Sequence, residues 1–136
     1  MNFKEIYESI KTIAVYGMST NPEKPSNSVP AFLKDKGFKV IPINPRAEEI
    51  NGDKAYDSIH SVQDKIDVLN IFRPSDEIPE ITKKAIERKN AKGDIRIIWC
   101  QLGIVNDEAK KMAEDNNITF IQDHCMLQEY KNHMGG

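Results

Sequence analysis

The sequence predicts an α/β fold built on an open, parallel, five-stranded sheet with helices on both faces. Its short apolar runs, such as Ile13–Val15 and Ile97–Trp99, are continuous rather than alternating, which is typical of strands covered on both faces. Between these runs lie segments whose apolar residues recur at helical spacing. Short loops join the two kinds of segment, and such strand–helix–strand units bring successive strands into a parallel sheet through right-handed crossovers.

The first half of the chain contains two of the expected strands. Apolar residues at helical spacing predict a short leading helix over residues 3–10, and the apolar run at 12–16 is the first strand. A helix is expected from Ser26 to Gly37, because its apolar stripe stops at a glycine, a residue that commonly follows helix ends. Residues 38–43 are the second strand.

The second half continues the alternation after a polar stretch at 46–63, in which Asn51-Gly52 predicts a turn. The remaining strands are expected at residues 67–72, 95–100 and 118–122. Helices are expected at 78–90 and 105–113, and a short apolar segment around 126–130 closes the chain. No repeat or linker interrupts this pattern, so residues 1–136 are expected to form a single domain.

Composition narrows the class of protein. With 136 residues the chain is long enough for one core, and a formal net charge of −2 lacks the basic excess of a bulk nucleic-acid binder. No apolar run approaches membrane-spanning length. Acidic residues within the first ten positions argue against a secretory signal, and two cysteines then favour a reducing compartment. We expect a cytoplasmic protein that binds neither nucleic acid nor membrane.

Candidate binding residues follow the strands, since ligands of open parallel sheets bind outside the carboxyl ends of the strands. These residues are Gly17, Met18, Ser19 and Thr20 after the first strand, Asn44, Pro45 and Arg46 after the second, Phe72 and Arg73 after the third, Gln101 after the fourth, and Asp123, His124 and Cys125 after the fifth. Several loops suited to an anion or a purine meet at one edge, which favours a binding site over a set of ordinary turns.

The loop after the first strand has the position of a phosphate-binding loop but lacks the dinucleotide fingerprint. Ser19 and Pro22 stand where Gly-x-Gly-x-x-Gly requires its second and third glycines. The N-terminus of the next helix favours an anion, and Ser26 is expected to cap that helix. We expect the backbone of Gly17–Ser19 to cradle a diphosphate within reach of Lys24.

The helix after the third strand begins with a similar pattern, in which Ser75 precedes Pro79 by four positions. A serine cap is therefore expected here too. Asp76 and Glu77 would repel a phosphate, so this helix is expected to contact adenosine or the linker of the ligand rather than a phosphate group.

Arg46 discriminates between ligand classes. An NAD-binding domain places an acidic residue after its second strand to hold the ribose hydroxyls, whereas this chain has Asn44, Pro45 and Arg46. A basic residue at this position suits a phosphorylated ribose, with either the 2′-phosphate of NADP or the 3′-phosphate of coenzyme A. A coenzyme A-binding module without chemistry of its own and an NADP-type nucleotide-dependent reductase both remain open.

Five motifs occur in order along nearly the whole chain. They are Val15–Ser19 with Pro22 and Lys24–Ser26, then Val40–Pro45, Asp67–Arg73, Trp99–Gly103 and Asp123–Cys125. With these motifs the chain resembles the small, stand-alone CoA-binding proteins. Their Rossmann-like domain is related to the CoA-binding domain of the succinyl-CoA synthetase α-subunit.

This resemblance implies that the ligand is CoA or an acyl-CoA. By the family's pattern, the loop from Gly17 to Lys24 would hold the diphosphate, and Asn44–Arg46 would meet the phosphoadenosine. Phe72–Arg73 would flank the adenine or the start of the pantetheine arm, and Gln101 would lie near that arm. The synthetase has a further domain with a phosphorylated histidine, which maps onto no part of these 136 residues, so its ligase activity is not implied.

The sequence predicts no catalytic or metal-binding residue. His60, His124 and His133 lack the spacing of metal ligands. His124 and Cys125 are adjacent, and neighbouring side chains in an extended segment diverge, so they suit a base–nucleophile pair poorly. Binding is the expected activity, with any chemistry supplied by a partner protein. Cys125 is expected at the ligand edge, where it could exchange with the CoA thiol, and Cys100 is expected to be buried.

Overall fold

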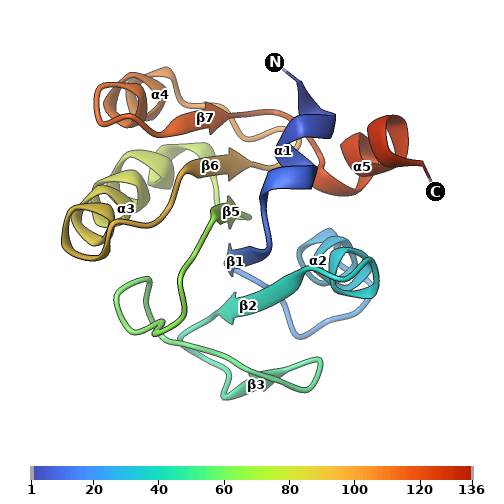
Figure 1. Cartoon of the computed structure of the whole chain (residues 1–136). Coiled ribbons are helices and arrows are strands. Elements are labelled where there is room, and N and C mark those ends of the chain that lie inside the picture. The colour runs from blue at the N-terminus through green and yellow to red at the C-terminus, as the bar shows by residue number, and fades with distance from the viewer. Residues whose placement is uncertain (1, 136) are drawn as a thin grey trace.

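The computed structural model describes residues 2–135, which form a parallel five-stranded sheet between two layers of helices (Figure 1). The strand order is β2-β1-β5-β6-β7, and every neighbouring pair is parallel. The strands are β1 (Thr12–Tyr16), β2 (Lys39–Ile43), β5 (Val68–Ile71), β6 (Ile97–Cys100) and β7 (Thr119–Ile121). The predicted α/β, Rossmann-like fold is therefore confirmed.

Helices cover both faces of this sheet (Figure 1). One layer comprises α1 (Phe3–Ser9), α2 (Pro25–Asp35) and α5 (Met126–Met134), and the other comprises α3 (Ile78–Lys92) and α4 (Asp107–Glu114). Leu33 and Met126 share one apolar core with Trp99, whereas Ala85 and Ala109 belong to the core on the opposite face. Burial on both faces explains why the strands read as continuous apolar runs.

The helix α2 begins one residue earlier than Ser26, and Ser26 does not cap it. Lys24 is the N-cap residue and makes no capping bond with its side chain, and Pro25 occupies the first helical position. Proline suits that position because its missing N–H would have no partner there and its φ is already helical. The serine cap expected at Ser26 is therefore wrong, and its hydroxyl stays available for a ligand.

The serine cap expected at Ser75 is also wrong. A single 3₁₀ turn, η1 (Ser75–Glu77), precedes α3, and Glu77 is the N-cap residue of that helix. The Ser75 hydroxyl instead accepts a hydrogen bond from the N–H of Val105 at 3.0 Å. This bond ties the β5–η1 loop to the loop that follows β6.

A small hairpin lies inside the polar stretch at 46–63, for which the sequence predicts only a turn. Its antiparallel strands, β3 (Glu49–Ile50) and β4 (Asp53–Lys54), flank Asn51 and Gly52, whose φ angles are 54° and 85°. Positive φ at both central residues is typical of the tight hairpin turns that Asn-Gly favours. The predicted turn is confirmed. The two strands beside it were not predicted, because a strand of two residues is too short to show a pattern in the sequence.

The strand order locates the natural binding crevice. β1 lies between β2 and β5 (Figure 1), so the chain passes from β1 to one side of the sheet and later crosses to the other side. In open α/β sheets, ligands bind at the carboxyl ends of the strands where the order reverses in this way. Separately, none of the helices within residues 2–135 is both long and apolar enough to cross a membrane.

Candidate ligand-binding site

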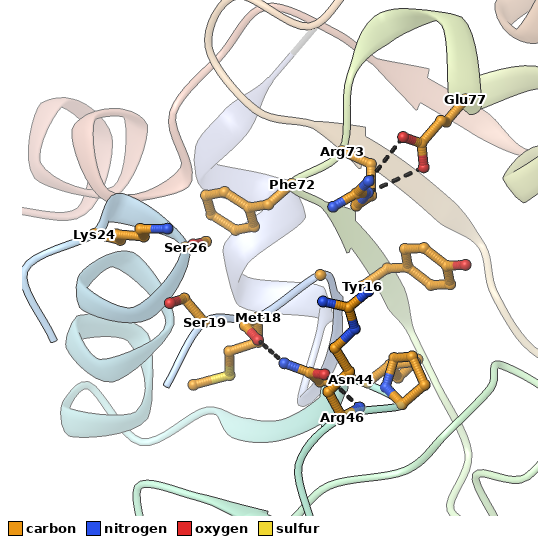
Figure 2. A pocket seen from close by; sticks show the side chains of 13 residues that line it. Tyr16, Met18, Ser19, Lys24, Ser26, Asn44, Arg46, Phe72, Arg73 and Glu77 are labelled. Atoms are coloured by element: carbon orange, nitrogen blue, oxygen red, sulfur yellow. Dashed lines mark hydrogen bonds and ion pairs between the residues drawn. The ribbon is translucent and has the colours of Figure 1, made fainter. Parts of the chain in front are cut away.

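A cavity of about 740 Å³ lies at the carboxyl ends of β1, β2 and β5, at the switch point of the sheet (Figure 2). Its walls come from the three loops that follow these strands, together with the start of α2 and the turn η1. The lining residues are Tyr16, Gly17, Met18, Ser19, Lys24, Ser26, Ile43, Asn44, Pro45, Arg46, Phe72, Arg73 and Glu77.

The structure brings most of the candidate residues together in this cavity. Gly17, Met18, Ser19, Lys24, Ser26, Asn44, Pro45, Arg46, Phe72 and Arg73 all line it. Gln101 lies outside it, in an adjoining groove of about 360 Å³ that shares Lys24, Ser26, Phe72 and Arg73 with the cavity. Thr20 is exposed and lines neither space, so its candidate role finds no support in the geometry.

Gly17 is required where the chain turns out of β1. Its φ is +85°, a region that L side chains rarely adopt. A Cβ at this position would lie 2.8 Å from the carbonyl oxygen of Phe72 and 3.0 Å from Cδ of Arg73. The absence of a side chain therefore lets the β1 and β5 loops touch at the floor of the cavity.

Two asparagines hold the carbonyl groups of the first loop. Asn44 Nδ2 donates to the Met18 carbonyl at 2.9 Å, and Asn27 Nδ2 donates to the Ser19 carbonyl at 2.8 Å. Asn27 is buried in α2 and also exchanges side-chain hydrogen bonds with Asn51 of the hairpin turn, at 3.3 Å each. Because both carbonyls are engaged, the loop does not turn unpaired acceptors toward an anion.

Two of the backbone N–H groups that were expected to cradle a diphosphate are already hydrogen-bonded within the protein. Gly17 N–H donates to the Ile43 carbonyl at 3.0 Å, and Ser19 N–H donates to the Ser26 carbonyl at 3.2 Å. The second bond exists because Pro30 has no N–H, which leaves the Ser26 carbonyl without its usual partner four residues along the helix. Within residues 2–135, the backbone N–H groups of Met18, Thr20 and Ser26 have no hydrogen-bond partner, and of these three residues Met18 and Ser26 line the cavity.

The cavity is rich in positive charge. Lys24, Arg46 and Arg73 line it, and Glu77 is the acidic residue among the lining side chains. The backbone N–H of Arg46 donates to Asn44 Oδ1 at 2.8 Å, which fixes the turn that carries this arginine. Figure 2 shows the side chains of Arg46 and Arg73 extending toward the same space.

Arg73 and Glu77 form a two-point ion pair at the cavity wall (Figure 2). Nε of Arg73 donates to Glu77 Oε1 at 3.0 Å, and Nη2 donates to Oε2 at 2.8 Å. This hydrogen bonding raises the pKa of Arg73 and lowers the pKa of Glu77, so both groups stay charged at neutral pH.

Tyr16, Ile43 and Glu77 line the cavity, yet the sequence did not single them out as binding residues. Tyr16 and Ile43 are the last residues of β1 and β2, so the rule that selects residues just after a strand passes over them. Glu77 was not expected near a phosphate because its negative charge would repel one. Its pairing with Arg73 is made between the β5 loop and η1, so no helical spacing in the sequence announced it.

The cysteines and histidines lie outside the cavity. Cys125 is the N-cap residue of α5 and lines neither the cavity nor the groove, so it does not face the expected ligand. Cys100 is buried, as expected, and burial raises its pKa to about 12. His124 contacts Glu129 at 2.7 Å, and no cluster within residues 2–135 could hold a metal ion.

Comparison with known proteins decides the family. The family model described as "CoA binding domain" matches residues 11–131. The chain belongs to this family. The Bacillus subtilis protein YneT is 36% identical over 123 residues, which cover 90% of this chain and 87% of that protein.

Larger enzymes contain a related region. An ADP-forming acetate–CoA ligase of Methanocaldococcus jannaschii is 31% identical over 120 residues, which cover 85% of this chain but only 17% of the ligase. The chain thus corresponds to about a sixth of that enzyme. Among solved structures, a Thermus thermophilus protein superposes with a TM-score of 0.88 at 30% identity, covering 98% of this chain and 99% of the other.

Proposed function

We propose that this CoA-binding-family domain binds coenzyme A, or an acyl-CoA, in the cavity at the ends of β1, β2 and β5. The observation that carries the proposal is the placement of Arg46 at the end of β2, beside a loop that offers free amides and hydroxyls. A ligand with a diphosphate and a separate phosphate on the ribose would match this distribution of charge.

The diphosphate is assigned to the β1 loop and the start of α2. The unpaired N–H groups of Met18 and Ser26 would donate to phosphoryl oxygens, and Lys24 would balance their charge. The hydroxyls of Ser19 and Ser26 add further donors. The positive end of the α2 dipole favours an anion at the same place.

The phosphoadenosine is assigned to the β2 loop. Arg46 would form a charge-assisted hydrogen bond with the 3′-phosphate, which is stronger than a neutral hydrogen bond. Tyr16, Pro45 and Phe72 supply apolar surfaces for the adenine ring. In the ligand-free cavity Glu77 is paired with Arg73, which offsets its negative charge before a nucleotide enters.

The pantetheine arm is assigned to the adjoining groove. Gln101 lines this groove and is 6% exposed, and its side-chain oxygen has no hydrogen-bond partner among residues 2–135. A buried unpaired acceptor costs free energy, and an amide N–H of pantetheine would satisfy it. Phe72, Leu102 and Ile104 provide the apolar surface that the methylene groups of the arm need.

The chain is proposed to bind its ligand without catalysing a reaction. Residues 1–136 would act as one CoA-binding domain, and a partner protein would supply any chemistry. The related acetate–CoA ligase supports this division, because the matching region is a small part of that enzyme. The NADP-type reductase is not favoured, since the family match concerns CoA and the glycine fingerprint is missing.

Calorimetry with CoA and with NADPH, on the full chain freed of bound ligand, tests this function. We expect CoA to bind and NADPH to bind much more weakly, because only CoA carries a pantetheine arm for the Gln101 groove. Preferential binding of NADPH, or no binding of CoA, would overturn the proposal.

A further inference from the structure

Arg73, one of the cations that could bind a phosphate ligand, is held in an ion pair with Glu77. Both residues line the cavity, and the pair is made through two hydrogen bonds of 3.0 and 2.8 Å. The side chains are 45% and 42% exposed, so solvent weakens their mutual attraction. Exposed pairs of this kind are weak, with contributions of at most about fivefold in an equilibrium constant.

The stem of Arg73 is fixed more firmly than its charged end. Its Cδ would lie 3.0 Å from a Cβ built on Gly17, so the methylene groups pack on the bare backbone of the β1 loop. Met18 follows Gly17 in the same loop, and its N–H has no partner within the described residues, 2–135. The exchange proposed below requires the guanidinium to turn about its terminal torsions from Glu77 toward an acceptor bound at that loop.

We propose that Glu77 competes with the ligand for Arg73: it pairs with Arg73 in the empty cavity and gives it up to a phosphoryl oxygen of the ligand. The inference rests on the proposed function, since it concerns the same cavity. A phosphoryl group provides two oxygens in a geometry that suits the guanidinium fork, as the Glu77 carboxylate does.

This exchange makes binding depend on where the ligand carries its charge. A ligand with a phosphoryl group at the β1 loop recovers the lost ion pair through Arg73. An anionic ligand without that group meets Glu77 still in place and gains nothing from Arg73. Glu77 therefore lowers the affinity of any ligand that draws on Arg73, and the contact of a phosphoryl group with Arg73 offsets part of that cost.

The experiment compares Glu77→Gln with Asp76→Asn by calorimetry with CoA. Both variants remove one negative charge from η1, but Asp76 is exposed and does not line the cavity. Because Arg73 no longer has to leave a partner, Glu77→Gln should raise the affinity for CoA about two- to fivefold more than Asp76→Asn does. Equal effects of the two variants, or weaker binding by Glu77→Gln, would overturn the proposal.

A second readout separates this inference from the proposed function. In ¹⁵N-labelled protein, the Nε–H resonance of Arg73, assigned with Arg73→Lys, should shift in Glu77→Gln and also when inorganic pyrophosphate is added to the unmodified protein. If CoA binds and this resonance stays fixed, the exchange is wrong although the function stands. If CoA does not bind, the function fails, and the pyrophosphate titration still decides the exchange: a fixed resonance rejects it.

Discussion

Gly17 shows how one residue couples the fold to the site. It has a positive φ, and it lies where the β1 loop packs closely against the Phe72 carbonyl of the β5 loop. Gly37 also has a positive φ, of +100°, but a Cβ there would come within 4 Å of nothing in the described part of the chain beyond its own neighbours. The two glycines therefore share a backbone constraint and differ in crowding.

We expect Gly17→Ala to destabilise the domain more than Gly37→Ala, and to weaken CoA binding as well. Left-handed φ costs a non-glycine residue about 1–2 kcal/mol at either position, and only at position 17 must the backbone also shift. Thermal unfolding and calorimetry measure the two effects. If both variants unfold alike and bind alike, the contact with Phe72 has no role in shaping the cavity.

Cys100 and Cys125 should differ in reactivity. Burial raises the pKa of Cys100 to about 12, so at pH 8 its thiol stays protonated and, being buried, is also out of reach of reagents. Cys125 is only partly buried. Treatment of the folded protein with iodoacetamide at pH 8 should give one adduct, on Cys125, and unfolding should give two.

Mass mapping after proteolysis identifies the modified residue. Labelling of Cys100 before Cys125 in the folded protein would contradict the burial that places Cys100 in the core. The unfolded protein serves as the control, because both thiols are then accessible.

At the scale of elements, α2 is joined to the first loop and to the hairpin through Asn27. Its side chain holds the Ser19 carbonyl and meets Asn51. Asn27→Ala would leave the Ser19 carbonyl unpaired, and such a loss costs about 1–3 kcal/mol at a buried site. We expect lower thermal stability and clearly weaker CoA binding.

Asn51→Gly is the matched control for this variant. Glycine accepts the left-handed φ of position 51, and the substitution removes the contact with the hairpin while Asn27 still holds Ser19. Calorimetry should therefore show nearly unchanged CoA affinity for Asn51→Gly. Equal losses in the two variants would mean that the hairpin, not the Ser19 carbonyl, is what Asn27 positions.

At the scale of the whole molecule, the fold was largely predictable because each strand is a continuous apolar run between helical patterns. The predicted strand at 12–16 coincides with β1, and the other main strands were located to within two residues at each end. Most of the cavity was also predictable, since parallel strands bring the residues that follow them to one edge.

Features that depend on long-range contacts were not predictable. Arg88 is 1% exposed and pairs with buried Asp94, while it also donates to the Ile59, Val62 and Asp64 carbonyls. Neither residue stands out in the sequence, because the charged partners meet only after the chain folds. The wrong serine cap at Ser75 has the same origin, since its hydroxyl is engaged by the loop that follows β6, whereas the one at Ser26 has a local cause, because the helix already begins at Pro25.

The most direct test of the account compares CoA with dephospho-CoA by calorimetry, in the unmodified protein and in Arg46→Ala. The two ligands differ only in the 3′-phosphate, and Arg46 is the cation assigned to it. A charge-assisted hydrogen bond at this partly solvated position should favour CoA by about tenfold, and Arg46→Ala should remove most of that preference. Equal affinity of the unmodified protein for the two ligands would contradict the account.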